Sequence, residues 1–144
     1  MNVHLYIGFL GPILLFLITA YLVWDTYLYA YVFFFIMNSV LNQVLKQLFH
    51  QPRPSHSKSI IHETTDQYGM PSGHAQSVFF STSFLYFTRG PFPFVFLELC
   101  ISMLTLYQRW SYRQHTINQL LVGSLVGIMF SFCVMRLSPL LFLL

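Results

Sequence analysis

Two histidines in this chain each stand just before an apolar run, where an imidazole can exchange a proton near neutral pH. His74 follows Ser72 and Gly73, a pattern typical of a helix start whose free N–H groups bind an anion. His115 follows a second polar segment. Two such histidines can divide phosphoryl transfer between them, because one attacks phosphorus while the other protonates the leaving oxygen and then activates water.

Three fixed cations, Lys46, Arg53 and Arg109, suit the oxygens of a phosphoryl group, and an arginine can bind two of them at once. Phosphoryl transfer requires little beyond positioning, charge stabilisation, a nucleophile and an acid. No metal or other cofactor is expected, because His56 and His62 lack compact ligand spacing and have no cysteine near them. The residue types predict a metal-independent phosphate site.

The composition indicates that membrane helices position these groups. Of the 144 residues, 56% are hydrophobic and 8% are charged, whereas a soluble domain carries about 25% charged residues. The formal charge of +3 is not spread over a polar surface, so no nucleic-acid partner is expected. We predict a single all-α domain over residues 1–144, a polytopic membrane helix bundle. Its five transmembrane helices are expected at residues 3–24, 26–45, 73–88, 94–107 and 116–135.

The connectivity of five spans brings the polar segments together. The second span ends and the third begins on one membrane face, and the fourth ends and the fifth begins on that same face. Residues 46–72 and 108–115 are therefore predicted to be the active-site loops. They gather at one rim Lys46, Arg53, the Ser72–His74 turn, Arg109 and His115.

A polar stripe leads toward this rim. Asn38, Asn42 and Lys46 follow at steps of four and share one helix face. Because polar groups in lipid are costly, the stripe should face the bundle interior. Hydrogen bonding between helices and a binding role stay equally open for Asn38, while a site role is favoured for Asn42 and Lys46.

Three motifs together carry a family resemblance: Lys46-x6-Arg53-Pro54, Pro71-Ser72-Gly73-His74 and Arg109-x5-His115. Their order and intervals resemble the signature of the type-2 phosphatidic acid phosphatase superfamily, over about residues 38–127. The resemblance implies a lipid phosphatase/haloperoxidase-like core, with His115 as nucleophile and His74 as acid and base. It also implies that phosphate is bound by Lys46, Arg53, Ser72, Gly73 and Arg109.

Two positions depart from the family pattern. Gln108 stands where a serine is usual, and Gln119 stands where an aspartate would follow the nucleophile. A glutamine carbonyl can orient an imidazole through a hydrogen bond but lacks the carboxylate's charge. His115 and Gln119 are one helical turn apart, so we predict that Gln119 orients the nucleophile. The departure also fits a weakened site.

A narrower resemblance explains the glutamine. Residues Tyr68–Gln76 and His115–Gln119 resemble the dolichyl-diphosphatase branch, in which glutamine is common at this spacing. The resemblance implies hydrolysis of a polyprenyl diphosphate, most similar to dolichyl diphosphate, to the monophosphate and phosphate. That reaction recycles the lipid carrier of protein N-glycosylation. Asn42, Gln76, Arg113 and Lys58 are candidate secondary contacts, although ordinary solvated charge explains Arg113 and Lys58 equally well.

Two arguments about orientation disagree. The positive-inside rule would place the rim in the cytosol, because the rim carries Lys46, Arg53, Lys58, Arg109 and Arg113 against Arg89 and Arg136 opposite. Three of those five cations are claimed for catalysis, which biases the count, and the resemblance implies the lumenal face of the endoplasmic reticulum. We therefore predict a lumenal active site. The alternatives are a phosphatase for phosphatidic acid or undecaprenyl diphosphate, and a non-catalytic membrane protein that binds lipid phosphates.

Overall fold

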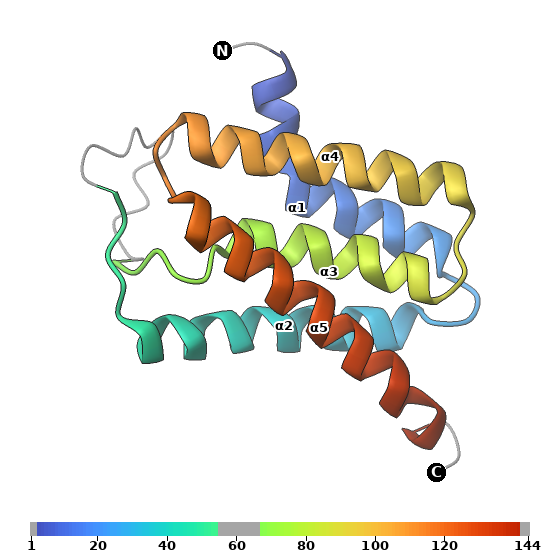
Figure 1. Ribbon diagram of the computed structural model, residues 1–144. Coiled ribbons are helices and arrows are strands. Elements are labelled where there is room, and N and C mark those ends of the chain that lie inside the picture. Colours follow the sequence, from blue (N-terminus) through green and yellow to red (C-terminus); the bar gives the residue numbers. More distant parts are fainter. Residues whose placement is uncertain (1–2, 55–66, 142–144) are drawn as a thin grey trace.

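The computed structural model describes residues 3–54 and 67–141, and the regular structure in these ranges is helical apart from one isolated bridge between Pro52 and Tyr68. The helices are α1 (Val3–Leu22), α2 (Leu28–Phe49), α3 (Gly73–Phe87), α4 (Phe92–Ser111) and α5 (Ile117–Leu141). Figure 1 shows them as one bundle. The predicted all-α membrane bundle is confirmed. The predicted loop residues Lys58, His56 and His62 lie outside the described residues.

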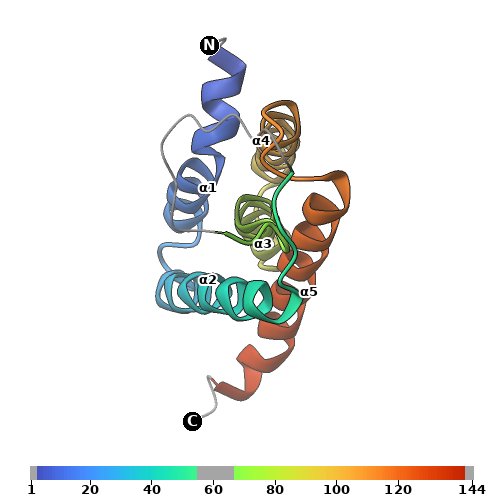
Figure 2. The ribbon, with the colours of Figure 1, turned by 90° about the vertical axis from the view of Figure 1, so that its left-hand side faces the viewer.

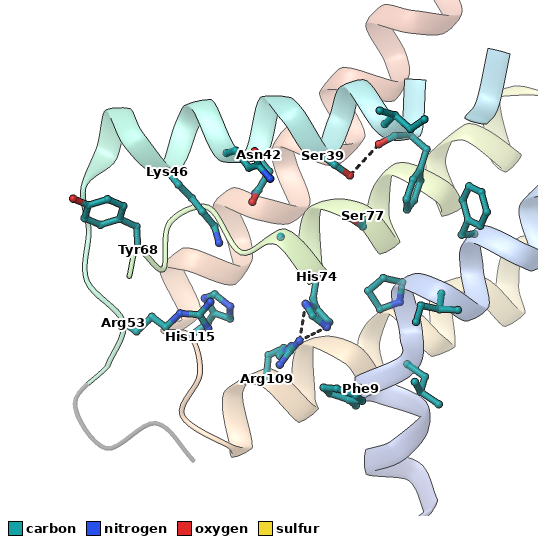
Figure 3. Close-up of a pocket in the computed structure, with 18 of the residues that line it drawn as sticks. Phe9, Ser39, Asn42, Lys46, Arg53, Tyr68, His74, Ser77, Arg109 and His115 are labelled. Carbon is teal, nitrogen blue, oxygen red and sulfur yellow. Dashed lines mark hydrogen bonds between the residues drawn. The ribbon is translucent and has the colours of Figure 1, made fainter. Parts of the chain in front are cut away.

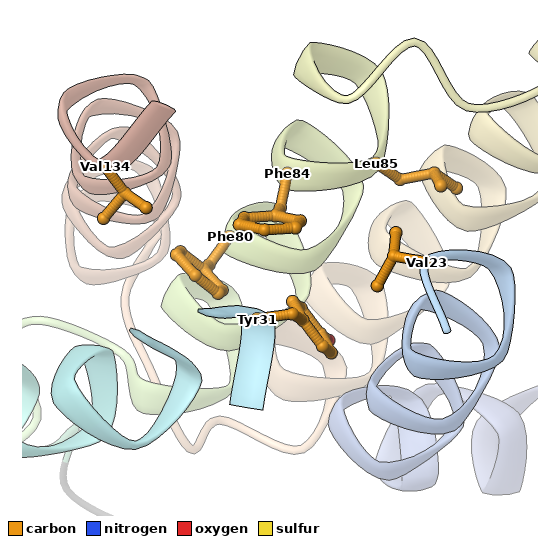
Figure 4. Packing of buried hydrophobic residues seen from close by; sticks show 6 residues of the cluster. All are labelled: Val23, Tyr31, Phe80, Phe84, Leu85 and Val134. Atoms are coloured by element: carbon orange, nitrogen blue, oxygen red, sulfur yellow. The ribbon is translucent and has the colours of Figure 1, made fainter. Parts of the chain in front are cut away.

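The bundle is built around α3, which contacts each of the other four helices. Figure 2 shows α3 nearly end-on, with α1, α2, α4 and α5 around it. Its aromatic side chains carry the core: the Tyr31 and Phe80 rings stack with centroids 6.1 Å apart and planes 12° apart. The core cluster shown in Figure 4 comprises Val23, Tyr31, Phe80, Phe84, Leu85 and Val134. This core holds α3 among the other helices, and the opposite end of α3 begins at Gly73, next to His74.

Three helices continue past the apolar stretches that predicted them: α5 extends to Leu141 rather than to residue 135, and α2 and α4 extend at the site end. α2 extends to Phe49 and α4 to Ser111, so Lys46 and Arg109 lie in last helical turns rather than in the predicted loops 46–72 and 108–115. The chain leaves the helical conformation where the backbone turns left-handed, at His50 (φ 47°) and Arg113 (φ 53°). The length of an apolar stretch reflects how much of a helix lies in lipid, whereas the end of the helix is set by these backbone turns.

Three of the described helices are long and apolar enough to cross a membrane: Leu5–Leu22, Leu28–Phe49 and Ile117–Leu137. Spans were also predicted for α3 and α4, but these two helices are not among the three. α3 has 15 residues, and the buried residues of α4 are polar or charged apart from Ile101. α3 and the buried face of α4 pack against protein, where hydrogen bonds replace lipid contact.

Buried polar pairs join the helices inside the bundle. Thr19 Oγ1 of α1 donates to Glu98 Oε1 of α4 at 2.7 Å, and the hydroxyls of Tyr31 and Ser81 lie 2.7 Å apart. Pro12 lies inside α1, which changes direction part-way along its length (Figure 1). The first contact joins α1 to α4, and the second joins α2 to α3.

α3 and α5 pack closely together, and two glycines of α5 permit this approach. A Cβ atom at Gly123 would lie 2.6 Å from the Ser72 carbonyl oxygen, and one at Gly127 would lie 2.9 Å from the Phe80 nitrogen. Both obstacles are backbone atoms, which cannot rotate away. The Gly123/Gly127 pair therefore sets the distance between α5 and the start of α3.

Replacing Gly127 tests this packing. We expect Gly127→Leu to lower the free energy of unfolding by about 1–3 kcal/mol or more, because the side chain meets α3 backbone. Thermal unfolding in detergent measures the loss. Met129→Leu, on the same helix at a 64% exposed position, is the matched control and should unfold near the wild-type temperature. Equal stability of Gly127→Leu and wild type would contradict the close packing.

Candidate active site

A cavity of about 1050 Å³ opens at the end of the bundle where α2 and α4 end and α3 begins. Figure 3 shows the predicted cations and histidines converging on it. Its polar end contains Lys46, Arg53, Gly73, His74, Arg109 and His115. The structure therefore brings together residues that lie up to 69 positions apart in the sequence (115 − 46).

Local chemistry at the start of α3 places His74. Ser72 is the N-cap residue, and its side-chain oxygen accepts from the Ala75 N–H at 3.4 Å. Gly73 begins the helix and lines the cavity, so the first N–H groups of α3 lie where an anion can approach. Ser72 is fully buried and is not among the residues lining the cavity. The observed contact of its side chain is the helix cap.

Arg109 lies in the last turn of α4 and reaches His74 across the cavity (Figure 3). Its Nη2 donates to the His74 ring, 2.6 Å from Nδ1, and its Nη1 donates to Gln114 Oε1. The guanidinium carbon also lies 5.4 Å from the centre of the Phe9 ring. A guanidinium only donates, so the His74 nitrogen that it meets must present a lone pair.

His115 is 4% exposed, and its orientation is fixed by a backbone group. Its Nδ1 donates to the Gly69 carbonyl oxygen at 2.9 Å. Because a carbonyl oxygen can only accept, the proton of the neutral ring resides on Nδ1 and the lone pair on Nε2. The ring therefore offers an unprotonated nitrogen as a nucleophile.

The electrostatic surroundings keep His115 neutral. Burial first, and then the charges of Arg53, Arg109 and Lys46, lower its pKa from 6.5 to about 3, with the Gly69 hydrogen bond acting in the opposite direction. Burial and nearby positive charge both disfavour the imidazolium. Figure 3 shows Lys46 and Arg53 extending toward His115. The same charges that attract an anion thus preserve the nucleophilic form of the ring.

A buried amide network connects α2 to α3 behind the cavity. Asn42 Nδ2 donates to Gln76 Oε1 at 2.8 Å and to the Pro71 carbonyl at 3.2 Å. Gln76 Nε2 donates to both oxygens of Asn38 at 2.9 Å. Asn38 and Gln76 thus join helices, while Asn42 does so and also lines the cavity. The polar stripe predicted along α2 faces the bundle interior, as expected.

Comparison with protein families identifies the chain. The model of the PAP2 superfamily matches residues 27–142. The chain belongs to the PAP2 superfamily. Comparisons with curated proteins and with solved structures gave no match. Members of the PAP2 superfamily are phosphatases acting on lipid phosphates, so the cavity is the candidate active site of an integral-membrane phosphatase of this superfamily.

The PAP2 site differs from the sequence prediction at Gln119. A direct hydrogen bond from the His115 ring to the Gln119 carbonyl was expected, but Nδ1 of His115 donates to the Gly69 carbonyl. Within the described chain, the Gln119 amide instead bonds Thr116, Gln51 and Pro52. One helical turn is sufficient separation for a contact, but the adjoining 51–52 segment offers better-placed partners for the amide.

Arg113 lies apart from the predicted cations. It is exposed and lines a smaller cavity of about 430 Å³ that shares His115 with the main one. Its left-handed backbone directs the chain from α4 toward α5. A secondary contact with substrate stays a prediction for this residue.

Sequence reasoning missed three contributors to this PAP2 site. Phe9 belongs to α1, which precedes the matched region, and an aromatic residue in an apolar span carries no distinguishing signal. Gln114 holds Arg109 and is 5% exposed, and its position next to His115 was the available clue. Gly69 acts through its backbone carbonyl, which no residue-type pattern can reveal.

The protonation state of His115 is directly testable. We expect its ring to stay neutral from pH 7.5 to pH 5 in the ligand-free protein, because its pKa lies near 3. Nuclear magnetic resonance of 13C,15N-labelled histidine measures this, with the His115→Asn variant assigning the signal. Arg53→Met should move the pKa upward, toward 6.5, by removing a repelling charge.

The lowered pKa of His115 also makes the free energy of unfolding depend on pH. The unfolded chain binds the proton first, so the contribution of His115 to the free energy of unfolding falls as pH drops from about 6.5 toward about 3. A ring that titrates near 6.5 in the folded protein would contradict the proposed electrostatics.

Proposed function

We propose that this PAP2 protein hydrolyses a polyprenyl diphosphate, most similar to dolichyl diphosphate, to the monophosphate and inorganic phosphate through a phosphohistidine. We place this activity at the lumenal face of the endoplasmic reticulum, where it recycles the lipid carrier of N-glycosylation. One observation carries the proposal. The cavity containing the three cations and both histidines continues without interruption into an apolar cleft.

That cleft runs between α1 and α2. Its lining is apolar on both sides: Phe9, Leu10, Pro12, Ile13 and Phe16 from α1, and Val32, Phe35 and Ile36 from α2. An isoprenoid tail is a long chain of methyl-branched apolar units that must stay in lipid while its charged head reaches polar groups. A cleft with apolar walls and a cationic end matches such an amphiphile.

The first chemical step forms the covalent intermediate. The Nε2 lone pair of His115 attacks the terminal phosphorus, the bond from phosphorus to the bridging oxygen breaks, and that oxygen keeps the electron pair. Lys46, Arg53 and Arg109 offset the charge on the phosphoryl oxygens. When Arg109 turns to the phosphate it releases the His74 nitrogen, which then takes up a proton from solvent and passes it to the leaving oxygen.

The second step restores the histidine. A water loses its proton to His74 and its oxygen attacks phosphorus, the P–N bond breaks, and the electron pair returns to Nε2 of His115. Inorganic phosphate leaves, and the cycle closes with Nδ1 still donating to Gly69. Each histidine thus performs the role for which its position suits it.

The leaving group distinguishes diphosphate from monoester substrates. Cleaving a diphosphate expels a phosphate whose pKa is about 6, whereas cleaving phosphatidic acid expels an alkoxide whose conjugate acid is about as weak as water. A diphosphate also carries more negative charge toward the three cations. The proposed substrate therefore needs less help from an acid and more from fixed positive charge.

Phosphate release from purified protein tests the function. We expect release from dolichyl diphosphate with kcat/KM at least about ten-fold above that for phosphatidic acid, with undecaprenyl diphosphate giving the effect of tail length. His115→Ala should abolish release because no nucleophile remains. His50→Asn is the matched control: His50 is exposed with φ 47°, a conformation that asparagine tolerates.

Three outcomes would contradict this proposal. Full activity in His115→Ala would exclude the phosphohistidine. Preference for phosphatidic acid would indicate a phosphatase for lipid phosphate monoesters. Lipid binding without any phosphate release would indicate a non-catalytic protein that binds lipid phosphates, the alternative suggested by Gln119.

The acid and base roles of His74 can be tested by finding which reaction step fails when it is replaced. With a diphosphate substrate, His74→Ala should form the phosphoenzyme but hydrolyse it at least about 100-fold more slowly, because water lacks its base. With phosphatidic acid the same variant should not even form the phosphoenzyme, because the alkoxide lacks its proton. Acid-labile 32P bound to the protein measures the intermediate. Equal labelling by both substrates would contradict the assigned role.

A further inference from the structure

We propose that the Gly69 carbonyl and Gln119 form a neutral positioning device for His115, in place of a carboxylate. Gly69 holds the ring in the tautomer that exposes Nε2, and Gln119 is a positioning residue that acts through Gly69. The inference rests on the proposed function, since it concerns His115 as the nucleophile of that reaction.

The contact of Gly69 with His115 is the first observation. The 2.9 Å hydrogen bond from Nδ1 to the Gly69 oxygen fixes both the plane and the tautomer of the ring. If the carbonyl moved away, the proton could reside on Nε2, and the ring would then have no lone pair facing the phosphate.

Gln119 packs directly on Gly69. A Cβ atom at residue 69 would lie 2.7 Å from both Nε2 and Oε1 of Gln119 and 2.8 Å from its Cδ. Gly69 is not among the residues with positive φ, so its backbone does not require glycine. The glycine is required for space, because the Gln119 amide lies against its Cα.

The Gln119 amide is itself held on both sides, and Gln119 is 1% exposed. Its Oε1 accepts from the Thr116 N–H at 3.1 Å, and its Nε2 donates to Gln51 Oε1 at 3.2 Å and to the Pro52 carbonyl at 3.0 Å. A carboxylate cannot make the last two contacts, because it has no proton to donate.

A second path ties Gly69 to the same segment. The Gly69 N–H donates to the Gln51 carbonyl at 2.8 Å. Gln119, Gln51 and Gly69 thus form a closed set of contacts that ends at the Nδ1 of His115. Movement of any member displaces the carbonyl on which the histidine depends.

The neutrality of this device has a charge consequence. Lys46, Arg53 and Arg109 line the cavity beside His115. A carboxylate at residue 119 would attract those cations and offset part of their field, whereas an amide leaves their charge for the substrate. A site for a highly charged head group gains from this exchange, although the phosphohistidine receives less stabilisation than a carboxylate would give.

The test uses Gly69→Ala, Gln119→Ala and their double variant, with Asn118→Ala as the control because Asn118 is exposed one residue before Gln119. We expect each single variant to lower kcat for diphosphate hydrolysis by about ten-fold or more with KM within about two-fold. In the Gln119→Ala background the obstacle is gone, so Gly69→Ala should cost less than about two-fold further. Asn118→Ala should match wild type. Melting temperatures establish that each variant is folded.

A second readout is independent of activity. In 15N spectra of labelled histidine, ligand-free wild-type His115 should show the Nδ1–H tautomer alone, and Gly69→Ala and Gln119→Ala should show a mixture. If the tautomer shifts in the variants while wild type releases no phosphate from any substrate, the proposed function fails and the positioning device stands.

Several results would overturn the device itself. The tautomer could be unchanged in both folded variants, the losses in kcat could multiply in the double variant, or the loss could appear in KM alone. A gain in kcat for Gln119→Asp would also overturn it, because that result would mean that the site lacks a carboxylate rather than uses an amide.

Discussion

The structure depends on the contact between the start of α3 and the first turns of α5. The Ser72 N–H donates to the Gln119 carbonyl at 3.1 Å, and Gly123 leaves room for the Ser72 backbone. This contact fixes where His74 lies relative to His115, since both residues adjoin it. Without it, two histidines 41 positions apart (115 − 74) would have no common site.

The second constraint is the burial of positively charged side chains in the protein interior. Lys46 and Arg109 are 7% and 1% exposed, and burying such cations costs free energy that surrounding groups must offset. Arg109 forms hydrogen bonds with Gln114 and His74 and a cation–π contact with the Phe9 ring. Phe9 lies on α1, outside residues 27–142 that match the PAP2 superfamily. α1 therefore completes the site as well as one wall of the apolar cleft.

The third feature is the substitution of neutral groups for an expected carboxylate. His115 is oriented by a backbone carbonyl, and the amide of Gln119 supports that carbonyl rather than the ring. A carbonyl dipole fixes a tautomer as well as a carboxylate does, but it leaves the positive field of the cavity undiminished. An amide rather than a carboxylate at residue 119 thus adds no negative charge to the site.

The sequence by itself determined the helical membrane fold, the superfamily, and the convergence of Lys46, Arg53, His74, Arg109 and His115, because hydropathy and connectivity dictate which helix ends share a face. It did not determine that Lys46 and Arg109 lie within helices, because helices end at backbone turns rather than at the limit of apolar residues. Only the tertiary structure decided that Gly69 orients His115 and that Phe9 contacts Arg109. Those contacts depend on a backbone carbonyl and on a helix outside the motifs, and neither leaves a pattern in residue types.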